Sequence, residues 1–448
     1  YNYNIGQLHS LIKAKKIHYR DIVEECINRT KEIDPKYHVW SFFDEKDIIN
    51  QISDNFSLTN SEYDMSGIPV AIKDIFNTKI LPTQMGSSIW KNFTAGNDAR
   101  VVHSLKEAGA IIAGKAVTAE FAVHKLNETL NPHDIKLTPG TSSSGSAVSV
   151  ATRVCPVAIG SQTAGSIVRP ASFTGVYGFK PSYGLIPRTG MLKTTDTLDS
   201  IGFFTVHFKD LLRVFDAVRV RGKNYPLSNG PLTDIKRQNK IKLKPWRVAF
   251  IKTYTWDNAE EYAKNSIEQY VNKVANLNDV EVEEIKLPKE FDRIHKLHSI
   301  IYRKALSYYF SKEYKTFDQM SDTMIDLIEQ GLKISPADYN DAINEQHFLI
   351  NSMDQIMKKH DVLISLSTAG VAPPREIEEK IDPSLIWNTL HLPTVAVPGF
   401  VNDNNIPFGF QVCSRKYNDY LLLNFLDYIY ENEMIPEKMN PVIKKNIL

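Results

Sequence analysis

Cysteine is rare in this chain, net charge is almost absent, and no apolar run is long enough to cross a membrane,. The three cysteines, Cys26, Cys155 and Cys413, lie far apart in the sequence and match no metal-binding or redox spacing, which favours a reducing compartment,. The 53 basic and 52 acidic residues leave a formal net charge of +1, so neither nucleic acid nor an anionic membrane is an expected partner,. The first residues are also too polar for a signal peptide, so we expect a cytoplasmic protein. We expect it to use no metal and no cofactor.

Two motifs that would indicate other enzyme classes are incomplete. Residues 109–116 match the G-x-x-x-x-G-K start of a phosphate-binding loop, but Ala116 lacks the hydroxyl that binds Mg²⁺ in such loops,. The interior of this segment, Ala-Ile-Ile-Ala, is typical of a strand rather than of a loop. Residues 140–144 begin like the G-x-S-x-G turn of α/β-hydrolases, but they end in Ser144 and no strand directly precedes them,. We therefore expect neither nucleotide binding nor an α/β-hydrolase.

The apolar patterns that are present predict an α/β protein. With 42% hydrophobic residues, the chain can bury one large core or two smaller ones,. Two strand–helix–strand successions are predicted, and such successions are typical of parallel units. The first has strands at 66–75 and 110–113 with a helix at 98–109 between them. The second has strands at 246–251 and 280–285 with a helix at 259–275 between them. Helices are also expected at 5–33, in two pieces, and through most of 291–360. Further strands are expected near 361–364, 392–399 and 406–411.

Two Gly/Ser-rich turns, 138–147 and 161–170, bracket an apolar segment that is expected to cross the core as a helix and then a strand. Apolar neighbours bury these turns, and a buried loop must satisfy its polar backbone, so such a loop is seldom kept without a use. Glycine and serine allow backbone geometries that bring N–H groups close to a bound atom. The two turns therefore indicate a site for an anion or an oxyanion.

A serine nucleophile in such a site needs a base, and none of the 12 histidines lies near either turn in the sequence,. A lysine can replace histidine if burial lowers its pKa, because desolvation disfavours the ammonium form. Lys73 ends an apolar run that Gly67 and Pro69 open. A lysine at this place is either a core-facing functional group or an outward-facing residue of an edge strand, and the apolar neighbours on both faces favour the first interpretation.

The two turns and the lysine strand resemble the motifs of the amidase signature family of serine hydrolases. The chain reads G-I-P-V-A-I-K-D, then T-P-G-T-S-S-S-G-S-A, then S-Q-T-A-G-S-I, in the order and spacing of that family. The resemblance implies that Ser166 is the nucleophile, that Ser142, held by a cis peptide bond, relays the proton, and that Lys73 is the final base. It also implies the fold, a large mixed, mostly parallel, twisted β-sheet covered by helices on both faces.

Further roles are expected for residues beside these motifs. The candidates for an oxyanion hole are the backbone N–H groups of Thr163, Ala164, Gly165 and Ser166. The candidates for substrate contacts are Thr141, Ser143 and Gln162. Ser143 can equally bond to the backbone of its own loop. Lys115 and Glu120 match the family's G-K-x-x-x-x-E-F-A pattern, and we expect them to pack and pair behind the site.

The organisation expected from the resemblance is one amidase domain over residues 1–448. Its parts would be N-terminal helices at 1–60, the signature core at 61–205, a variable helical substrate region at 206–360 and a C-terminal return to the sheet at 361–448. The motifs are strong between 67 and 204 and loose in the helical region. The resemblance leaves room for a homodimer and does not identify the substrate.

The leading functional hypothesis is an amidase that hydrolyses a small-molecule or peptidic carboxamide to a carboxylate and ammonia or an amine, through a seryl acyl-enzyme. A second hypothesis is the A-type subunit of a glutamine-dependent amidotransferase, which supplies ammonia to a partner protein. Arg169 lies one place later than the arginine of the glutamine-using members, which counts against this second hypothesis. A third is a catalytically silent scaffold on the same fold.

Overall fold

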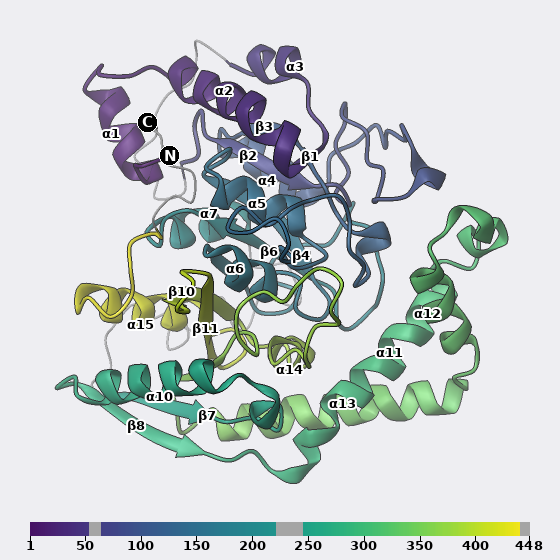
Figure 1. The fold of residues 1–448 in the computed structure, drawn as a ribbon, viewed down its shortest axis with the longest axis vertical. Coiled ribbons are helices and arrows are strands. Elements are labelled where there is room, and N and C mark those ends of the chain that lie inside the picture. Colours follow the sequence, from purple (N-terminus) through teal and green to yellow (C-terminus); the bar gives the residue numbers. More distant parts are fainter. Residues whose placement is uncertain (53–63, 221–244, 440–448) are drawn as a thin grey trace.

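The computed structural model describes residues 1–52, 64–220 and 245–439, which form one mixed sheet of eleven strands with helices on both faces (Figure 1). The strands are β1 (Trp40–Phe42), β2 (Pro69–Lys73), β3 (Ile111–Ala116), β4 (Val157–Gln162), β5 (Tyr177–Lys180), β6 (Ser200–Thr205), β7 (Trp246–Ile251), β8 (Val280–Ile285), β9 (Val362–Leu366), β10 (Thr394–Val401) and β11 (Pro407–Ser414). The α-helices are α1 (Ile5–Lys13), α2 (Tyr19–Tyr37), α3 (Glu45–Asn50), α4 (Arg100–Glu107), α5 (Ser144–Ala151), α6 (Val168–Thr174), α7 (Asp210–Val218), α10 (Glu261–Ala275), α11 (Ile294–Tyr309), α12 (Asp322–Leu332), α13 (Pro336–Ile356), α14 (Ser384–Thr389) and α15 (Asp419–Glu431). Short 3₁₀ helices are η1 (Ser88–Trp90), η2 (Glu120–Ala122), η3 (Trp256–Asn258), η4 (Lys289–Arg293) and η5 (Glu313–Gln319).

The strand order across the sheet is β1-β3-β2-β4-β6-β5-β10-β11-β9-β7-β8. Parallel pairing joins β2 to β3 and β4 near one edge, and β7 to β8 and β9 near the other. Both parallel sets contain a predicted strand–helix–strand unit, with α4 and α10 as the crossover helices,. The predicted large mixed sheet is therefore confirmed.

Parallel pairing covers less of the sheet than the resemblance implied. From β4 through β6, β5, β10 and β11 to β9, each successive pair of strands is antiparallel. For one of these pairs the reason is a local connection, since a short turn joins β10 directly to β11 and no crossover helix lies between them,. Antiparallel neighbours follow from such a hairpin.

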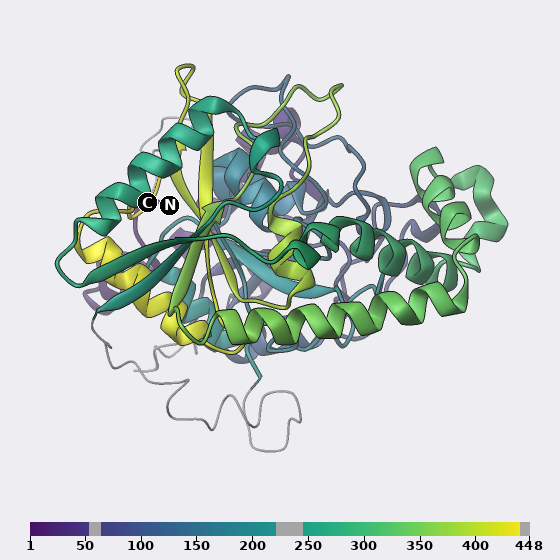
Figure 2. The same ribbon diagram turned by 90° about the horizontal axis from the view of Figure 1, so that it is seen from below.

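Side-chain alternation in β2 sends neighbouring residues to opposite faces of the sheet. Val70 and Ile72 belong to the larger core, which also contains residues of α1, α4, α7, α10 and α15. Ala71 belongs to a second core with α5 and α6, and alternation places Lys73 on that same face. Figure 2 shows α10 and α15 on one side of the strands and the green helices α11 to α13 on the other.

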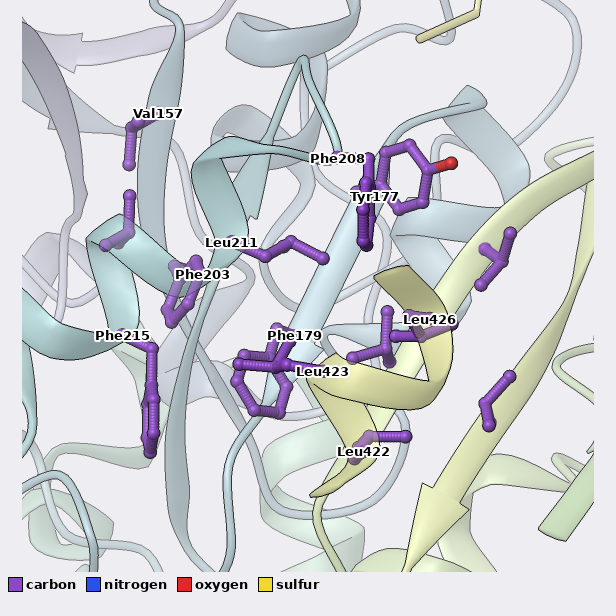
Figure 3. Packing of buried hydrophobic residues seen from close by; sticks show 14 of the residues in the cluster. Val157, Tyr177, Phe179, Phe203, Phe208, Leu211, Phe215, Leu422, Leu423 and Leu426 are labelled. Carbon is purple, nitrogen blue, oxygen red and sulfur yellow. The ribbon is translucent and has the colours of Figure 1, made fainter. Parts of the chain in front are cut away.

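Aromatic rings of β5, β6 and α7 pack against leucines of α15 in the larger core (Figure 3). The ring of Phe179 lies 5.5 Å from that of Phe203 and 5.4 Å from that of Phe215. In α7 the apolar residues recur three or four places apart, as an amphipathic helix requires. They are Leu211, Val214, Phe215 and Val218.

Helices α11, α12 and α13 form a helical arm, residues 294–356, that extends from the sheet (Figure 1). Ser335 caps α13, because its Oγ accepts a hydrogen bond from the N–H of Asp338 at 3.1 Å,. Gly331 is the second-last residue of α12, which ends at Leu332. This glycine permits close packing of two helices, since a Cβ there would lie 2.0 Å from the carbonyl oxygen of Arg303.

Asp98 precedes α4 but does not cap it. Its carboxylate binds the N–H of Lys79 and the amine of Lys106, and the capping position is taken by Ala99. Cys26 and Cys155, which are far apart in the sequence, are buried free thiols with their Sγ atoms 3.8 Å apart. Most of the basic cluster at 236–247 lies outside the described residues.

Within the described ranges, no helix combines the length and the apolar character that are needed to cross a bilayer.

Truncation of Phe179 tests the packing of the larger core. The ring is 0% exposed, so Phe179→Ala should lower the free energy of unfolding by about 3–5 kcal/mol, through lost apolar burial and a remaining cavity. Phe348→Ala is the matched control, because this ring is 57% exposed and its loss should change stability by less than about 0.5 kcal/mol. Urea unfolding followed by circular dichroism measures both. Equal effects of the two substitutions would contradict the described packing.

Candidate active site

Lys73 is the last residue of β2, and its amine lies in a buried cluster of hydroxyl groups. The side chain is 0% exposed, so the core-facing interpretation of the sequence is confirmed. Its Nζ lies within hydrogen-bond distance of three serine Oγ atoms: Ser142 at 2.7 Å, Ser161 at 2.9 Å and Ser143 at 3.0 Å. Two of these serines precede α5, and the third lies near the end of β4, which pairs in parallel with β2. The peptide bond between Thr141 and Ser142 is cis.

The three hydroxyl groups differ in the partners that remain for their hydrogen atoms. Ser143 Oγ donates to the carbonyl of Ser161, 3.1 Å away, so towards Lys73 it acts as an acceptor. The hydroxyls of Ser142 and Ser161 have no other hydrogen-bond partner in the part of the chain that the structure describes. Either can donate to Nζ when the amine is neutral. The cluster can therefore hold an uncharged amine that receives a serine proton.

Burial lowers the pKa of Lys73 well below the ordinary value for lysine, because desolvation penalises the ammonium form, while the carboxylate of Asp199 opposes this in part,. Lys115 on the adjacent strand β3 is equally buried but has a carboxylate partner, with Nζ 3.0 Å from Asp74 Oδ1. This ion pair agrees with the pairing role expected for Lys115. Among the described residues, no carboxylate lies within ion-pair distance of Lys73.

Ser166 lies in the turn between β4 and α6 and is 7% exposed. The carboxamide oxygen of Gln162 accepts hydrogen bonds from the next two N–H groups, those of Ile167 at 2.8 Å and Val168 at 3.0 Å. The N–H groups of residues 164–166, in contrast, donate to no other group within the described ranges. Buried N–H groups are almost always paired in proteins. Gly165 and Ser166 are buried and Ala164 is half-buried, so these three consecutive unpaired groups indicate a site for a bound oxygen.

Gly165 is required in this turn by close approach rather than by backbone angles. A Cβ at this position would lie 1.8 Å from Asp382 Oδ2 and 2.6 Å from Ser384 Oγ. Thr163, two places earlier, is held through its hydroxyl, which donates to Asp199 Oδ1 at 2.9 Å. The turn is thus packed against two other segments of the chain.

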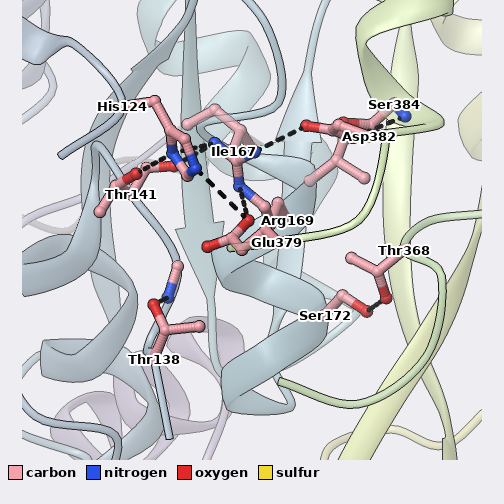
Figure 4. Close-up of polar contacts among 12 residues, drawn as sticks. His124, Thr138, Thr141, Ile167, Arg169, Ser172, Thr368, Glu379, Asp382 and Ser384 are labelled. Atoms are coloured by element: carbon pink, nitrogen blue, oxygen red, sulfur yellow. Dashed lines mark hydrogen bonds and ion pairs between the residues drawn. The ribbon is translucent and has the colours of Figure 1, made fainter. Parts of the chain in front are cut away.

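Arg169, on the first turn of α6, joins the two Gly/Ser turns to the segment before α14 (Figure 4). Its guanidinium donates to the carbonyl of Thr141 at 2.9 Å and to Asp382 Oδ2 at 3.1 Å. Its Nε lies 3.2 Å from Glu379 Oε2. Because Thr141 precedes Ser142, this network links the start of α6 to the serine that contacts Lys73.

His124 completes the network from the side of the first turn. Its Nδ1 lies 2.5 Å from Thr141 Oγ1 and 3.2 Å from a guanidinium nitrogen of Arg169. The charge of Arg169, together with burial, lowers the pKa of His124 to about 3. The ring is therefore neutral near pH 7, and Nδ1 accepts from both neighbours.

Arg169 and Asp382 also line a cavity of about 420 Å³. Most of its wall is apolar and comes from Phe173, from residues 368–374 and from residues 377–383. Three further carboxylates lie on the wall, those of Glu260, Glu378 and Glu379. Since Arg169 contacts Thr141 and Asp382 contacts Gly165, this cavity adjoins both Gly/Ser turns.

The three residues expected to contact substrate all bond to protein groups. Thr141 pairs with His124, Ser143 with Lys73 and the carbonyl of Ser161, and Gln162 with the start of α6. Their assignment as substrate-binding residues stays a prediction. Seven other residues contact the two turns or Lys73 or belong to the network around Arg169, although the sequence motifs assigned them no role. They are Ser161, His124, Asp199, His298, Glu379, Asp382 and Asn388.

The family comparison extends over most of the chain. A family model described as Amidase matches residues 21–423. The A-type subunit of glutamyl-tRNA(Gln) amidotransferase from Heliobacterium modesticaldum is 29% identical, and the match covers 96% of this chain and 96% of that protein.

Two solved structures share the fold over nearly their full length. The A-type subunit of glutamyl-tRNA(Gln) amidotransferase from Thermotoga maritima superposes with a TM-score of 0.77 at 25% identity, covering 95% of each chain. The native peptide amidase of Stenotrophomonas maltophilia superposes with a TM-score of 0.81 at 22% identity, covering 99% of this chain and 98% of that one. At 22% identity, the likeness to the peptide amidase shows a shared fold alone.

Replacement of Lys73 by methionine measures how far burial lowers its pKa. If the pKa of an amine is lower in the folded than in the unfolded protein, the folded state binds fewer protons at a given pH. The free energy of unfolding then increases as pH rises. We therefore compare the free energy of unfolding of the wild-type protein with that of Lys73→Met. As pH falls from the pKa of an exposed lysine, about 10.4, to the folded-state pKa, the wild-type value should decrease relative to the variant by about 1.4 kcal/mol per pH unit. Below the folded-state pKa the difference should stay constant. Urea unfolding of both proteins from about pH 6 to about pH 10 covers this window.

Lys115→Met is the matched control for the loss of a buried lysine. It leaves the carboxylate of Asp74 buried without its partner, so this variant should be less stable than the wild-type protein near pH 7,. A difference between wild type and Lys73→Met that does not change with pH would mean that Lys73 keeps an ordinary pKa.

Proposed function

Because the chain belongs to the amidase family, we propose that it hydrolyses the C–N bond of a carboxamide through an acyl-enzyme on Ser166, with Ser142 as proton relay and Lys73 as final base. The observation that carries this proposal is the buried amine of Lys73, which lies 2.7 Å from Ser142 Oγ and has no carboxylate partner in the described part of the chain. Desolvation favours the neutral amine, and a neutral amine is a base.

In the acylation step, Ser166 Oγ attacks the carbonyl carbon of the amide and forms the new C–O bond. The proton of Ser166 passes to Ser142 Oγ while the proton of Ser142 passes to the amine of Lys73. Negative charge develops on the carbonyl oxygen, and the N–H groups of residues 163–166 stabilise it as the oxyanion hole. Breaking of the C–N bond then returns the proton by the same relay to the leaving ammonia or amine.

In the deacylation step, water attacks the ester carbonyl of the acyl-enzyme. Its proton follows the same route through Ser142 to Lys73, and the ester C–O bond breaks. Ser166 takes back a proton from Ser142, and the product leaves as the carboxylic acid, which then gives its remaining proton to the solvent and becomes the carboxylate. One turnover therefore consumes one water and leaves the protein unchanged.

The cavity beside Arg169 is our candidate for the part of the substrate beyond the scissile bond. It adjoins both Gly/Ser turns, and its mostly apolar wall suits a small-molecule or peptidic amide,. Val371→Trp should narrow it and raise KM severalfold for amides found by a carboxamide screen. Labelling of Ser166 by the small reagent phenylmethanesulfonyl fluoride should continue. Unchanged KM values for every active amide would exclude the cavity from substrate binding.

A second candidate function is the ammonia-supplying component of an amidotransferase that uses glutamine. It is supported by the match to an A-type amidotransferase subunit over nearly the full length of both chains. The position of Arg169 counts against it, since the arginine follows Val168 here and pairs with Glu379 and Asp382. Ammonia release from glutamine, but not from simple carboxamides, would favour this second function. The reverse pattern would favour a free-standing amidase.

A fluorophosphonate probe tests the proposed nucleophile. The reagent should form a covalent adduct on Ser166, located by peptide mass spectrometry, and Ser166→Ala should abolish it. Ser142→Ala and Lys73→Met should slow the labelling about 10²–10⁴-fold, because each removes a proton-transfer group. Ser146→Ala is the matched control, since this buried hydroxyl donates to the carbonyl of Ile159 and should leave the rate close to that of the wild type.

An adduct on another residue, or a wild-type rate in Lys73→Met, would overturn the proposed roles. Complete absence of labelling and of amide hydrolysis would favour the catalytically silent scaffold instead.

A further inference from the structure

The carbonyl oxygen of Thr163 receives hydrogen bonds from two side chains that lie outside the Gly/Ser turns. Asn388 Nδ2 lies 2.6 Å from this oxygen and His298 Nε2 lies 3.0 Å from it. His298 is on α11, at the base of the helical arm, and Asn388 is on α14. Two donors from distant segments thus meet on one backbone oxygen at the start of the nucleophile turn.

Fixing this oxygen also fixes the direction of the next N–H group. The peptide bond between Thr163 and Ala164 is trans, so its C=O and N–H point in opposite directions,. An anchored Thr163 carbonyl therefore holds the N–H of Ala164 aimed away from His298 and Asn388. That N–H has no partner within the described ranges. It is one of the three consecutive unpaired N–H groups that lead up to Ser166.

Asn388 is held by a second contact, and the ring of His298 has a defined protonation state. Asn388 is 1% exposed, and its Nδ2 also donates to the carbonyl of Leu198 at 3.0 Å. Burial lowers the pKa of His298 to about 4, so near pH 7 its ring is neutral. Because a carbonyl oxygen can only accept, the proton of this neutral ring must lie on Nε2. The hydroxyl of Thr163 is bound separately by Asp199.

We propose that His298 and Asn388 are positioning residues that orient the Thr163–Ala164 peptide, so that the N–H of Ala164 points into the oxyanion hole. The inference rests on the proposed function, because it concerns the oxyanion that forms when Ser166 attacks. It gives the helical arm a part in catalysis, since His298 is a residue of α11 (Figure 1). A preoriented donor stabilises the transition state without reorganisation, so loss of the anchors should lower the rate of attack.

The test compares rates of fluorophosphonate labelling, in which the phosphoryl oxygen takes the place of the oxyanion. His298→Leu and Asn388→Leu should each slow the labelling of Ser166 at least about tenfold, and together about 10²-fold, approaching the effect of losing one oxyanion donor. His298→Gln, which can restore a donor to the Thr163 carbonyl, should recover most of the rate. If Asn388→Leu does not fold, Asn388→Asp removes the donor while keeping the shape.

The chain offers a matched pair of controls that contact neither Gly/Ser turn. Gln411 in β11 is 0% exposed, and its Nε2 donates to the carbonyl of Leu366 at 2.7 Å. His133 Nε2 bonds to the carbonyl of Thr174 at 3.0 Å. Gln411→Leu and His133→Leu therefore remove the same bond types without touching Thr163. They should label at rates close to that of the wild type.

The pH profile of labelling separates orientation from general damage. The midpoint of the rise with pH reports the titration of the base, so in the His298 and Asn388 variants it should stay in place while the plateau falls. Where Ser166 of the wild type is labelled, three results would overturn the inference. They are wild-type plateaus in folded His298 and Asn388 variants, a shifted midpoint in these variants, or an equal loss of rate in the Gln411 and His133 controls. If the wild-type protein itself gives no Ser166 adduct, the proposed function fails and the inference fails with it.

Discussion

The burial of one lysine amine among serine hydroxyls, with no carboxylate at ion-pair distance in the described part of the chain, is the constraint on which the rest of the site depends. Transfer of an ammonium ion from water into such a place is costly unless it is paired, so the amine is driven towards its neutral form,. Lys115, one strand away, shows the alternative, since Asp74 keeps it in an ion pair. Burial lowers the pKa of both lysines, but within the described ranges only Lys115 has a carboxylate at ion-pair distance to oppose it.

The scaffold around Lys73 brings the two turns to it by different means. Parallel pairing of β2 with β4 sets Ser161 beside the lysine, and the turn before α5 supplies Ser142 and Ser143. The second turn is held by the side chain of Gln162, which accepts from the N–H groups of Ile167 and Val168, and by the ion pairs of Arg169 with the segment before α14. Both turns are therefore fixed by buried polar contacts that leave the N–H groups of residues 164–166 without a partner in the described part of the chain.

The sequence predicted the parts of this site whose chemistry is local. The lysine strand, the two turns and the strand–helix–strand units follow from apolar periodicity and from Gly/Ser patterns, and the structure has them close to the expected ranges. The antiparallel centre of the sheet was missed because strand pairing depends on connections that periodicity does not record. Asp382 and His298 were missed because they come from segments without a motif and reach the site only through the tertiary fold. Asp199 was missed for the same reason, since its carboxylate meets Thr163 only in the folded chain.

The charge of the Lys73 side chain tests this account most directly. Nuclear magnetic resonance of protein labelled with ¹³C at the lysine ε-carbons, with the Lys73 signal assigned by its loss in Lys73→Met, follows that charge as pH changes. The account predicts a titration well below that of the exposed lysines and an uncharged amine at the pH at which Ser166 reacts fastest. A Lys73 signal that titrates together with the exposed lysines would contradict it.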